Sequence, residues 1–290
     1  MGADAFWSTH VFVLVSPDTI RRGLAGALAD RLRHEGFTPV AGRLVRTTPE
    51  MIDELYAEVI AGQWRTWQYR LVDLAFAAGP TLAMICRYTG DAANPHALMR
   101  VRKGHSSPQQ CPPGTIRHDF GAMNTILGVM HASDNPAESA TDAAVFGLSE
   151  SDAGVDGGPV DQLCALTAGR QPESRDYEAV LADVRAKCLL AVWPDLPDPL
   201  RYKLRAEFPV PAALGAVDAG GRLAALLDGE LPDAFVEVVG CEFTPQWRVE
   251  HRGVQVFATL HRHGVELDTW ERLVLETSLH FPSVRRGRAA

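Results

Sequence analysis

Short apolar runs that alternate with helix-like patterns constrain the first half of this 290-residue chain more than any other feature. Residues 10–15 read His-Val-Phe-Val-Leu-Val, a β-branched run that indicates a buried strand. Similar runs predict strands at residues 37–46, 81–88 and 126–131. Strands interleaved with helices favour an α/β sandwich, in which a sheet packs against helices.

The helices are predicted from caps and from periodic apolar residues. Leu24, Leu28 and Leu32 recur at i, i+4 spacing, and Gly36 would end that helix. A second helix is predicted to begin at Thr48. Further helical segments are predicted at residues 64–78, 95–103 and 137–147. This order of elements predicts a ferredoxin-like four-stranded antiparallel sheet backed by helices.

A small, polar and Gly-rich segment at residues 149–158 predicts a linker. It would separate one domain, residues 1–148, from a second domain, residues 159–290. The second domain is predicted to be α+β. Its expected strands lie at residues 234–243, 246–251 and 254–261, and its expected helices at residues 174–190 and 267–280. Its Cys241, His251, His261 and His263 leave a metal site open as an alternative. On a strand, His261 and His263 would share one face, but no second tight pair of ligands supports the site.

Composition limits the function classes. The formal net charge of −8 argues against nucleic acid as a partner, so any phosphate site has to be a local basic pocket. No apolar run reaches membrane-spanning length, and the N-terminus has no signal-peptide pattern. The five cysteines are widely spaced and include no CxxC pair, which indicates free thiols in a reducing compartment. We therefore expect a cytoplasmic protein without a membrane anchor.

The segment around His131 is the strongest candidate for chemistry. A histidine that faces an anion-binding pocket can carry a phosphoryl group, provided that a partner fixes its other ring nitrogen. Arg100 and Arg117 could act as forks for phosphate oxygens, and Ser106 could donate a hydrogen bond to phosphate. Asp134 could hold magnesium through water. Taken alone, however, His131 is more often a structural residue at a strand end.

Residues 9–148 resemble nucleoside diphosphate kinases. The resemblance rests on the order and spacing of several short motifs, of which residues 113–120, Pro-Gly-Thr-Ile-Arg-His-Asp-Phe, are the most specific. The others are Val15-Ser16-Pro17-Asp18, Arg22-Gly23-Leu24, Gly36-Phe37, the Tyr56 helix, Ala78-Gly79-Pro80, His131-Ala132-Ser133-Asp134 and Glu138-Ser139-Ala140. The resemblance implies that one nucleoside triphosphate phosphorylates His131, which then passes the phosphate to a nucleoside diphosphate.

The resemblance also assigns residue roles. Arg100 and Arg117 match the phosphate-binding arginines, Ser106 falls where the family has a threonine, and Tyr56 matches the tyrosine beside the phosphates. Ser133 matches the serine that follows the histidine. The implied cofactor is Mg²⁺ bound with ATP or another nucleoside triphosphate, the implied partners are nucleotides, and the implied assembly is a homo-oligomer.

Two positions depart from the family pattern. Ser16 stands where the family has a lysine that contacts the transferring phosphate, and Gly128 stands where it has an asparagine. The loop before Gly128 is one residue longer, and Asn124 has the wrong offset to replace that asparagine. Lys103 or Arg102 could compensate from the neighbouring helix, and Trp64 or Trp67 could stack on a base.

Three hypotheses follow from the retained and lost residues. The first is a nucleoside diphosphate kinase-like phosphotransferase that works through phospho-His131. The second is a specialised phosphotransferase whose C-terminal half reshapes acceptor choice. The third is a catalytically weak nucleotide-binding or regulatory module with a degenerate kinase site. A lost charged contact to phosphate is worth about 1.5–3 kcal/mol, or roughly ten- to a hundredfold in rate.

Overall fold

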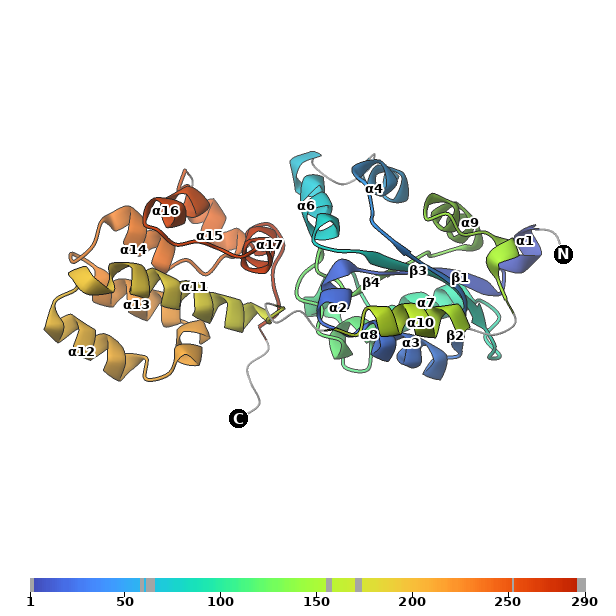
Figure 1. The fold of residues 1–290 in the computed structure, drawn as a ribbon, viewed down its shortest axis with the longest axis horizontal. Coiled ribbons are helices and arrows are strands. Elements are labelled where there is room, and N and C mark those ends of the chain that lie inside the picture. The colour runs from blue at the N-terminus through green and yellow to red at the C-terminus, as the bar shows by residue number, and fades with distance from the viewer. Residues whose placement is uncertain are drawn as a thin grey trace. The chain divides into compact units, whose positions relative to one another are not determined.

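The computed structural model describes residues 3–57, 60, 66–154, 158–169, 174–251 and 253–285. The chain divides into two compact units, Met1–Ser174 and Arg175–Ala290, which we call unit 1 and unit 2 (Figure 1). The predicted boundary at residues 149–158 is therefore about twenty residues too early. The helix α10, Gly158–Leu166, belongs to unit 1 because Val160 and Cys164 are buried in the core of that unit.

Unit 1 is built on a four-stranded antiparallel sheet, as predicted. Its strands are β1 (His10–Val15), β2 (Phe37–Val45), β3 (Thr81–Tyr88) and β4 (Met130–Ala132). Their order across the sheet is β2-β3-β1-β4, and β1 pairs antiparallel with both β3 and β4. This order leaves β4 at an edge of the sheet. Strand β4 is shorter than the predicted residues 126–131 because the backbone turns sharply just before Met130.

Helices cover both faces of this sheet. Alternation along β1 sends Val11, Val13 and Val15 into one apolar core and Phe12 and Leu14 into the other. The first core is closed by α2 (Pro17–Arg21), α3 (Ala25–His34), α7 (Pro95–Lys103), α8 (Ile116–Asp119) and α10. The second is closed by α1 (Ala3–Trp7), α4 (Pro49–Leu55), α6 (Thr66–Ala77) and α9 (Pro136–Val145).

Unit 2 is helical in the part of the chain that the structure describes, so the predicted second α+β domain is wrong. Its helices are α11 (Tyr177–Val192), α12 (Asp198–Glu207), α13 (Ala219–Leu227), α14 (Asp233–Val239), α15 (Pro245–Glu250), α16 (Val256–Arg262) and α17 (Thr269–Ser278). The three segments predicted as strands form α14, α15 and α16.

A helix cap in α15 and the spacing of buried residues in α16 explain why these two segments are helical. The Thr244 side chain accepts a hydrogen bond from the Trp247 N–H at 3.1 Å, and Pro245 occupies the first helical position of α15. In α16, Val256, Thr259 and Leu260 are buried at i, i+3, i+4 spacing. Short Val-rich runs suit strands and helices equally, and only these local caps and tertiary burial distinguish the two.

Neither a membrane-spanning helix nor a metal-binding cluster occurs among the described residues. No helix there is long and apolar enough to cross a membrane. No group of three or more His, Cys, Asp or Glu side chains there could hold a metal ion, so the alternative metal site in unit 2 is not formed. The five cysteines are free and buried.

Candidate functional site

The tight turn before β4 places His131 at the free edge of the sheet. Val129 has a positive φ of 74°, which is unusual for a β-branched residue, and the Met130 N–H donates to the Gly128 carbonyl at 2.9 Å. The Val129 carbonyl accepts from the Ser16 N–H at 3.1 Å and from the Thr19 hydroxyl at 2.8 Å. These bonds hold a strained backbone two residues before the candidate nucleophile.

Asp142 on α9 fixes the imidazole of His131. The His131 Nε2 lies 3.0 Å from the Asp142 Oδ2, and the Ser133 hydroxyl donates to the same oxygen at 2.6 Å. Because an ionised carboxylate only accepts hydrogen bonds, Nε2 carries the proton and Nδ1 keeps its lone pair. The His131 side chain is 23% exposed while Asp142 is 9% exposed, so the partner is buried and the imidazole remains accessible.

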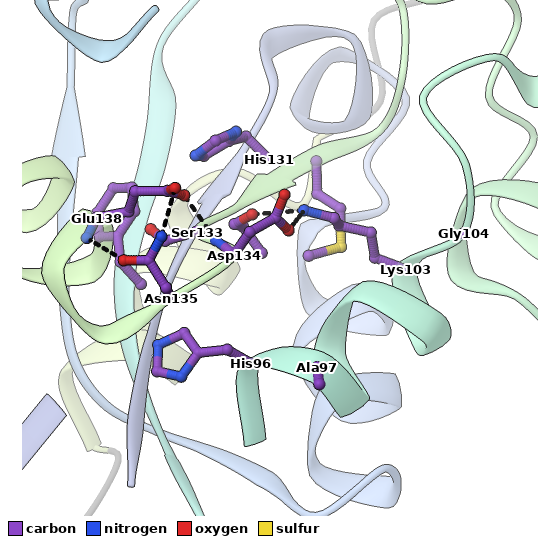
Figure 2. Close-up of polar contacts among 12 residues, drawn as sticks. His96, Ala97, Lys103, Gly104, His131, Ser133, Asp134, Asn135 and Glu138 are labelled. Atoms are coloured by element: carbon purple, nitrogen blue, oxygen red, sulfur yellow. Dashed lines mark hydrogen bonds and ion pairs between the residues drawn. The ribbon is translucent and has the colours of Figure 1, made fainter. Parts of the chain in front are cut away.

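A polar turn fixes the chain between His131 and α9 (Figure 2). The Asn135 side chain caps α9 by accepting from the Glu138 N–H at 2.9 Å. Glu138 returns two contacts: Oε2 accepts from the Asp134 N–H at 2.9 Å, and Oε1 accepts from the Asn135 amide at 2.6 Å. This reciprocal capping holds α9, and therefore Asp142, in register with β4.

Tyr56, which follows α4, packs its ring against the imidazole. The two ring centroids are 5.9 Å apart and the planes meet at 78°, an edge-to-face arrangement. Burial raises the pKa of Tyr56 to about 12, with Asp142 adding to the effect and Arg117 opposing it. The phenol is therefore neutral at physiological pH and can donate a hydrogen bond to an anionic ligand.

Arg117 from α8 packs against the β4 edge. Its Nη2 donates to the Met130 carbonyl at 3.0 Å, its Nη1 to the Gly104 carbonyl at 2.9 Å and its Nε to the Gly128 carbonyl at 3.2 Å. Burial lowers the pKa of Arg117. A guanidinium has five N–H donors, so these three bonds orient Arg117 and leave donors for a ligand.

Lys103 ends α7 and reaches the same edge of β4 (Figure 2). Its Nζ donates to the Ala132 carbonyl at 2.5 Å and lies 3.1 Å from the Asp134 Oδ1. The carbonyls of Met130 and Ala132, one on each side of His131, thus accept from Arg117 and Lys103 respectively. A buried lysine and a half-buried arginine therefore flank the candidate nucleophile along the free edge of its strand.

The remaining candidates lie around these residues with different exposure. Arg100 and Ser106 are exposed, on α7 and on the loop that follows it. Arg102 forms an ion pair with the Glu35 Oε2 at 3.0 Å. Trp64 lies outside the described residues, and Trp67 is described only as backbone within α6.

Asn124 does not replace the missing asparagine. It is buried, and its Oδ1 accepts from the Ile126 and Leu127 N–H groups at 3.0 Å each. The side chain therefore folds the longer loop before Gly128. The Gly128 carbonyl, by contrast, orients Arg117 through the backbone.

The residues near His131 do not form a site that would hold Mg²⁺ by protein ligands alone. Asp134, the predicted water-mediated ligand, is paired with Lys103, which neutralises its charge. The described residues contain no cluster of three metal-binding side chains.

Comparison with known proteins finds relatives that match most of unit 1. A family model described as nucleoside diphosphate kinase matches residues 9–150. The nucleoside diphosphate kinase of Moorella thermoacetica is 36% identical over 137 residues, which cover 47% of this chain and 92% of that protein. The chain belongs to the nucleoside diphosphate kinase family. The membership concerns unit 1, since residues beyond 150 lie outside the match.

Other relatives cover the same part of the chain. The nucleoside diphosphate kinase of Archaeoglobus fulgidus is 33% identical over 137 residues, 85% of its length. A crystal structure of the Aquifex aeolicus nucleoside diphosphate kinase is 26% identical and covers 50% of this chain and 98% of its own, with a TM-score of 0.42.

The structure brings four of the predicted candidate residues together at β4 and adds two neighbours that the sequence analysis did not place there. His131, Ser133, Tyr56 and Arg117 lie together around β4. Asp142 was missed, although Ser139, Asp142 and Ala143 form a buried stripe on α9 in which two members are polar. A polar residue on the buried face of a helix is the signal that could have found it. Lys103 was considered only as a substitute cation, without a predicted position.

Proposed function

We propose that unit 1 is a nucleoside diphosphate kinase-like phosphotransferase that acts through phospho-His131. The observation that carries this proposal is the His131–Asp142 contact of 3.0 Å. It reserves the Nε2 proton for Asp142 and leaves the Nδ1 lone pair available for attack.

In the first half-reaction, the His131 Nδ1 attacks the γ-phosphorus of a nucleoside triphosphate. A P–N bond forms while the bond from the γ-phosphorus to the bridging oxygen breaks, and the nucleoside diphosphate leaves. Asp142 stabilises the ring that becomes positively charged, because its carboxylate lies 3.0 Å from Nε2. In the second half-reaction, a terminal phosphate oxygen of another nucleoside diphosphate attacks phosphorus and returns the electron pair to Nδ1.

Several described groups can support the transferring phosphate. Arg117 has donors beyond the three that bond to backbone carbonyls, and Tyr56 offers a neutral phenol. Arg100 and Ser106 reach solvent on the side of α7, where a ligand can order them. Mg²⁺ bound to the nucleotide would neutralise phosphate charge. We also propose nucleotides as the partners of this unit and a homo-oligomer as its assembly.

Phosphohistidine formation tests this proposal directly. Incubation with γ-labelled ATP and Mg²⁺ should give an acid-labile, base-stable label on the full chain, and His131→Ala should abolish it. Asp142→Ala should slow labelling by roughly a hundredfold, the lower range for a group that assists a nucleophile, while leaving the label on His131. Absence of label, or a label that persists in His131→Ala, would contradict the proposal.

A second candidate function is a catalytically weak nucleotide-binding or regulatory module. The specific observation in its favour is Ser16, whose position bonds to the turn before β4 through the backbone but offers no cation there. Under this alternative, nucleotide binds with the affinity of a functional site while His131 labels very slowly. Calorimetric binding of ADP together with the labelling rate distinguishes the two candidates.

A further inference from the structure

Lys103 is a buried cation with no role in the reaction described so far. Its side chain is 9% exposed, whereas its ionic partner Asp134 is 49% exposed. The pair is therefore open to solvent on the side of the carboxylate. The Nζ also holds the Ala132 carbonyl, which belongs to the residue directly after His131.

Burying the ammonium group of Lys103 has a large desolvation cost. Removing a charge from water costs several kcal/mol even when it is paired, and an apolar side chain would fill a similar volume without that cost. Burial lowers the pKa of Lys103, with Asp134 opposing that effect. A buried charge beside a partly exposed candidate nucleophile therefore indicates that the charge itself acts at that site.

The other cations of α7 are placed differently. Arg102 is half exposed and pairs with Glu35, and Arg100 is exposed. Lys103, in contrast, touches the backbone of β4. An ammonium has three N–H donors, of which the Ala132 carbonyl and Asp134 take two.

We propose that Lys103 binds the transferring phosphoryl group and supplies the positive charge that is missing at Ser16. When the phosphate enters, the Nζ keeps its bond to the Ala132 carbonyl and exchanges the half-exposed Asp134 for a phosphate oxygen. Lys103 is thus a catalytic residue whose charge reaches the site from the free edge of β4. This role rests on the proposed function, because it requires phosphate at His131.

Charge variants of the pair distinguish phosphate binding from a merely structural ion pair. Lys103→Met should slow the initial labelling of His131 about ten- to a hundredfold, the factor that corresponds to one charged hydrogen bond. Lys103→Arg should stay within about threefold of the parent, and Asp134→Asn should label as fast as the parent or faster. The double variant Lys103→Met/Asp134→Asn should be as slow as Lys103→Met. Parental labelling by Lys103→Met or by the double variant would overturn the proposal.

A lysine introduced at position 16 tests whether positions 16 and 103 can supply the same positive charge to the phosphate. Ser16→Lys in the Lys103→Met background should restore most of the lost labelling rate, and the matched control Ser16→Met should restore none. In the parent, Ser16→Lys should change the rate less than in the Lys103→Met background. If Ser16→Lys does not restore the labelling rate of a folded Lys103→Met variant, the claim that Lys103 supplies the charge missing at position 16 is wrong.

Nucleotide binding separates failure of this inference from failure of the proposed function. Lys103→Met should weaken binding of a non-hydrolysable ATP analogue in calorimetry about tenfold and leave adenosine binding unchanged. A parent that binds the analogue but does not label His131 would refute the proposed function alone. A parent that labels His131, with Lys103→Met labelling and binding the analogue equally well, would refute the role of Lys103 alone.

Discussion

Both units bury charged side chains, but they use them differently. In unit 1, the buried Lys103 and Asp142 and the half-buried Arg117 all contact β4 or its histidine. In unit 2, the fully buried Arg185 donates to the Leu214 and Cys241 carbonyls at 2.8 and 3.0 Å and pairs with Glu242 at 2.6 Å. The first set surrounds a reactive nitrogen, while the second ties helix α11 to loops of its own unit.

The difference shows that burial of charge alone does not mark a functional site. Glu271 in α17 is fully buried, pairs with Lys187 at 2.6 Å and accepts from the Asp268 N–H in a capping box. These contacts complete the helix start and need no ligand. The cluster around His131 differs because the imidazole is partly exposed and, among the described residues, only its Nε2 has a hydrogen-bond partner. The accessible reactive atom, and not the buried charge, distinguishes unit 1.

The largest effect should come from removing the central cation of unit 2. Arg185→Met leaves the Val239, Leu214 and Cys241 carbonyls without this donor and removes one cation from Glu242, which keeps Arg285. The free energy of unfolding of unit 2 should therefore fall by about 3–5 kcal/mol. Urea denaturation, monitored by hydrogen exchange in α11, measures this loss in the free energy of unfolding. Labelling of His131 should be unchanged under conditions in which unit 2 stays folded.

Arg272→Met is the matched control. Arg272 is largely exposed and pairs with Glu276 at 3.3 Å, so its loss should cost about 1 kcal/mol or less. If both variants lower the free energy of unfolding by the same amount, Arg185 contributes no more than a surface ion pair. The inference that its buried charge stabilises unit 2 would then be wrong.

A smaller effect is expected at Asp18, a buried carboxyl of unit 1. Its Oδ2 has no hydrogen-bond partner among the described residues, and burial raises its pKa from 3.8 to about 6. Between about pH 4 and pH 6 the folded state holds a proton that the unfolded state has lost. Raising the pH through that window should therefore reduce the stability of unit 1, by about 3 kcal/mol in all.

Asp18→Asn should remove this pH dependence. The variant should have a flat free energy of unfolding between pH 4 and pH 6 relative to the parent, and it should be more stable than the parent at pH 7. Urea denaturation across this pH range measures the difference, with the exposed Glu54→Gln as a control that should follow the parent profile. A parent that gains stability as the pH rises, relative to Asp18→Asn, would contradict the burial argument.

The smallest effect tests the helical character of unit 2. Thr244→Ala removes the side chain that caps α15, so it should lower the free energy of unfolding by about 1 kcal/mol. Thr244→Ser keeps a hydroxyl and should cost much less. A neutral Thr244→Ala would favour the strand that the sequence predicted at residues 246–251.

The sequence predicted those parts of the molecule in which local pattern and tertiary environment agree. The run at residues 10–15 is β-branched and buried on both faces, so it forms β1 as expected. The run at residues 254–261 is equally apolar, but it forms α16 because its buried positions recur at helical spacing. The apolar content of six or seven residues does not separate these outcomes, because the positions that become buried are set by tertiary packing.

The site was predictable where a motif carries it. His131, Tyr56 and Arg117 lie in or beside such motifs, whereas Asp142 lies eleven residues after His131 without any. Its contact with the imidazole exists because α9 packs back onto β1 and β4, where the Ser139 hydroxyl also accepts from the Phe12 N–H at 3.1 Å. Contacts of this kind depend on helix docking, which sequence periodicity does not specify.

The free edge of β4 has a consequence for how this protein avoids unwanted association. An unpaired strand edge is an adhesive surface, onto which a strand from another molecule can add. Here the two outward carbonyls of β4 are already occupied by Lys103 and Arg117, so an incoming strand would find neither acceptor available. The cations that flank His131 thereby also protect the sheet against aggregation. A variant that lost both would leave the Met130 and Ala132 carbonyls free to pair with a strand of another molecule.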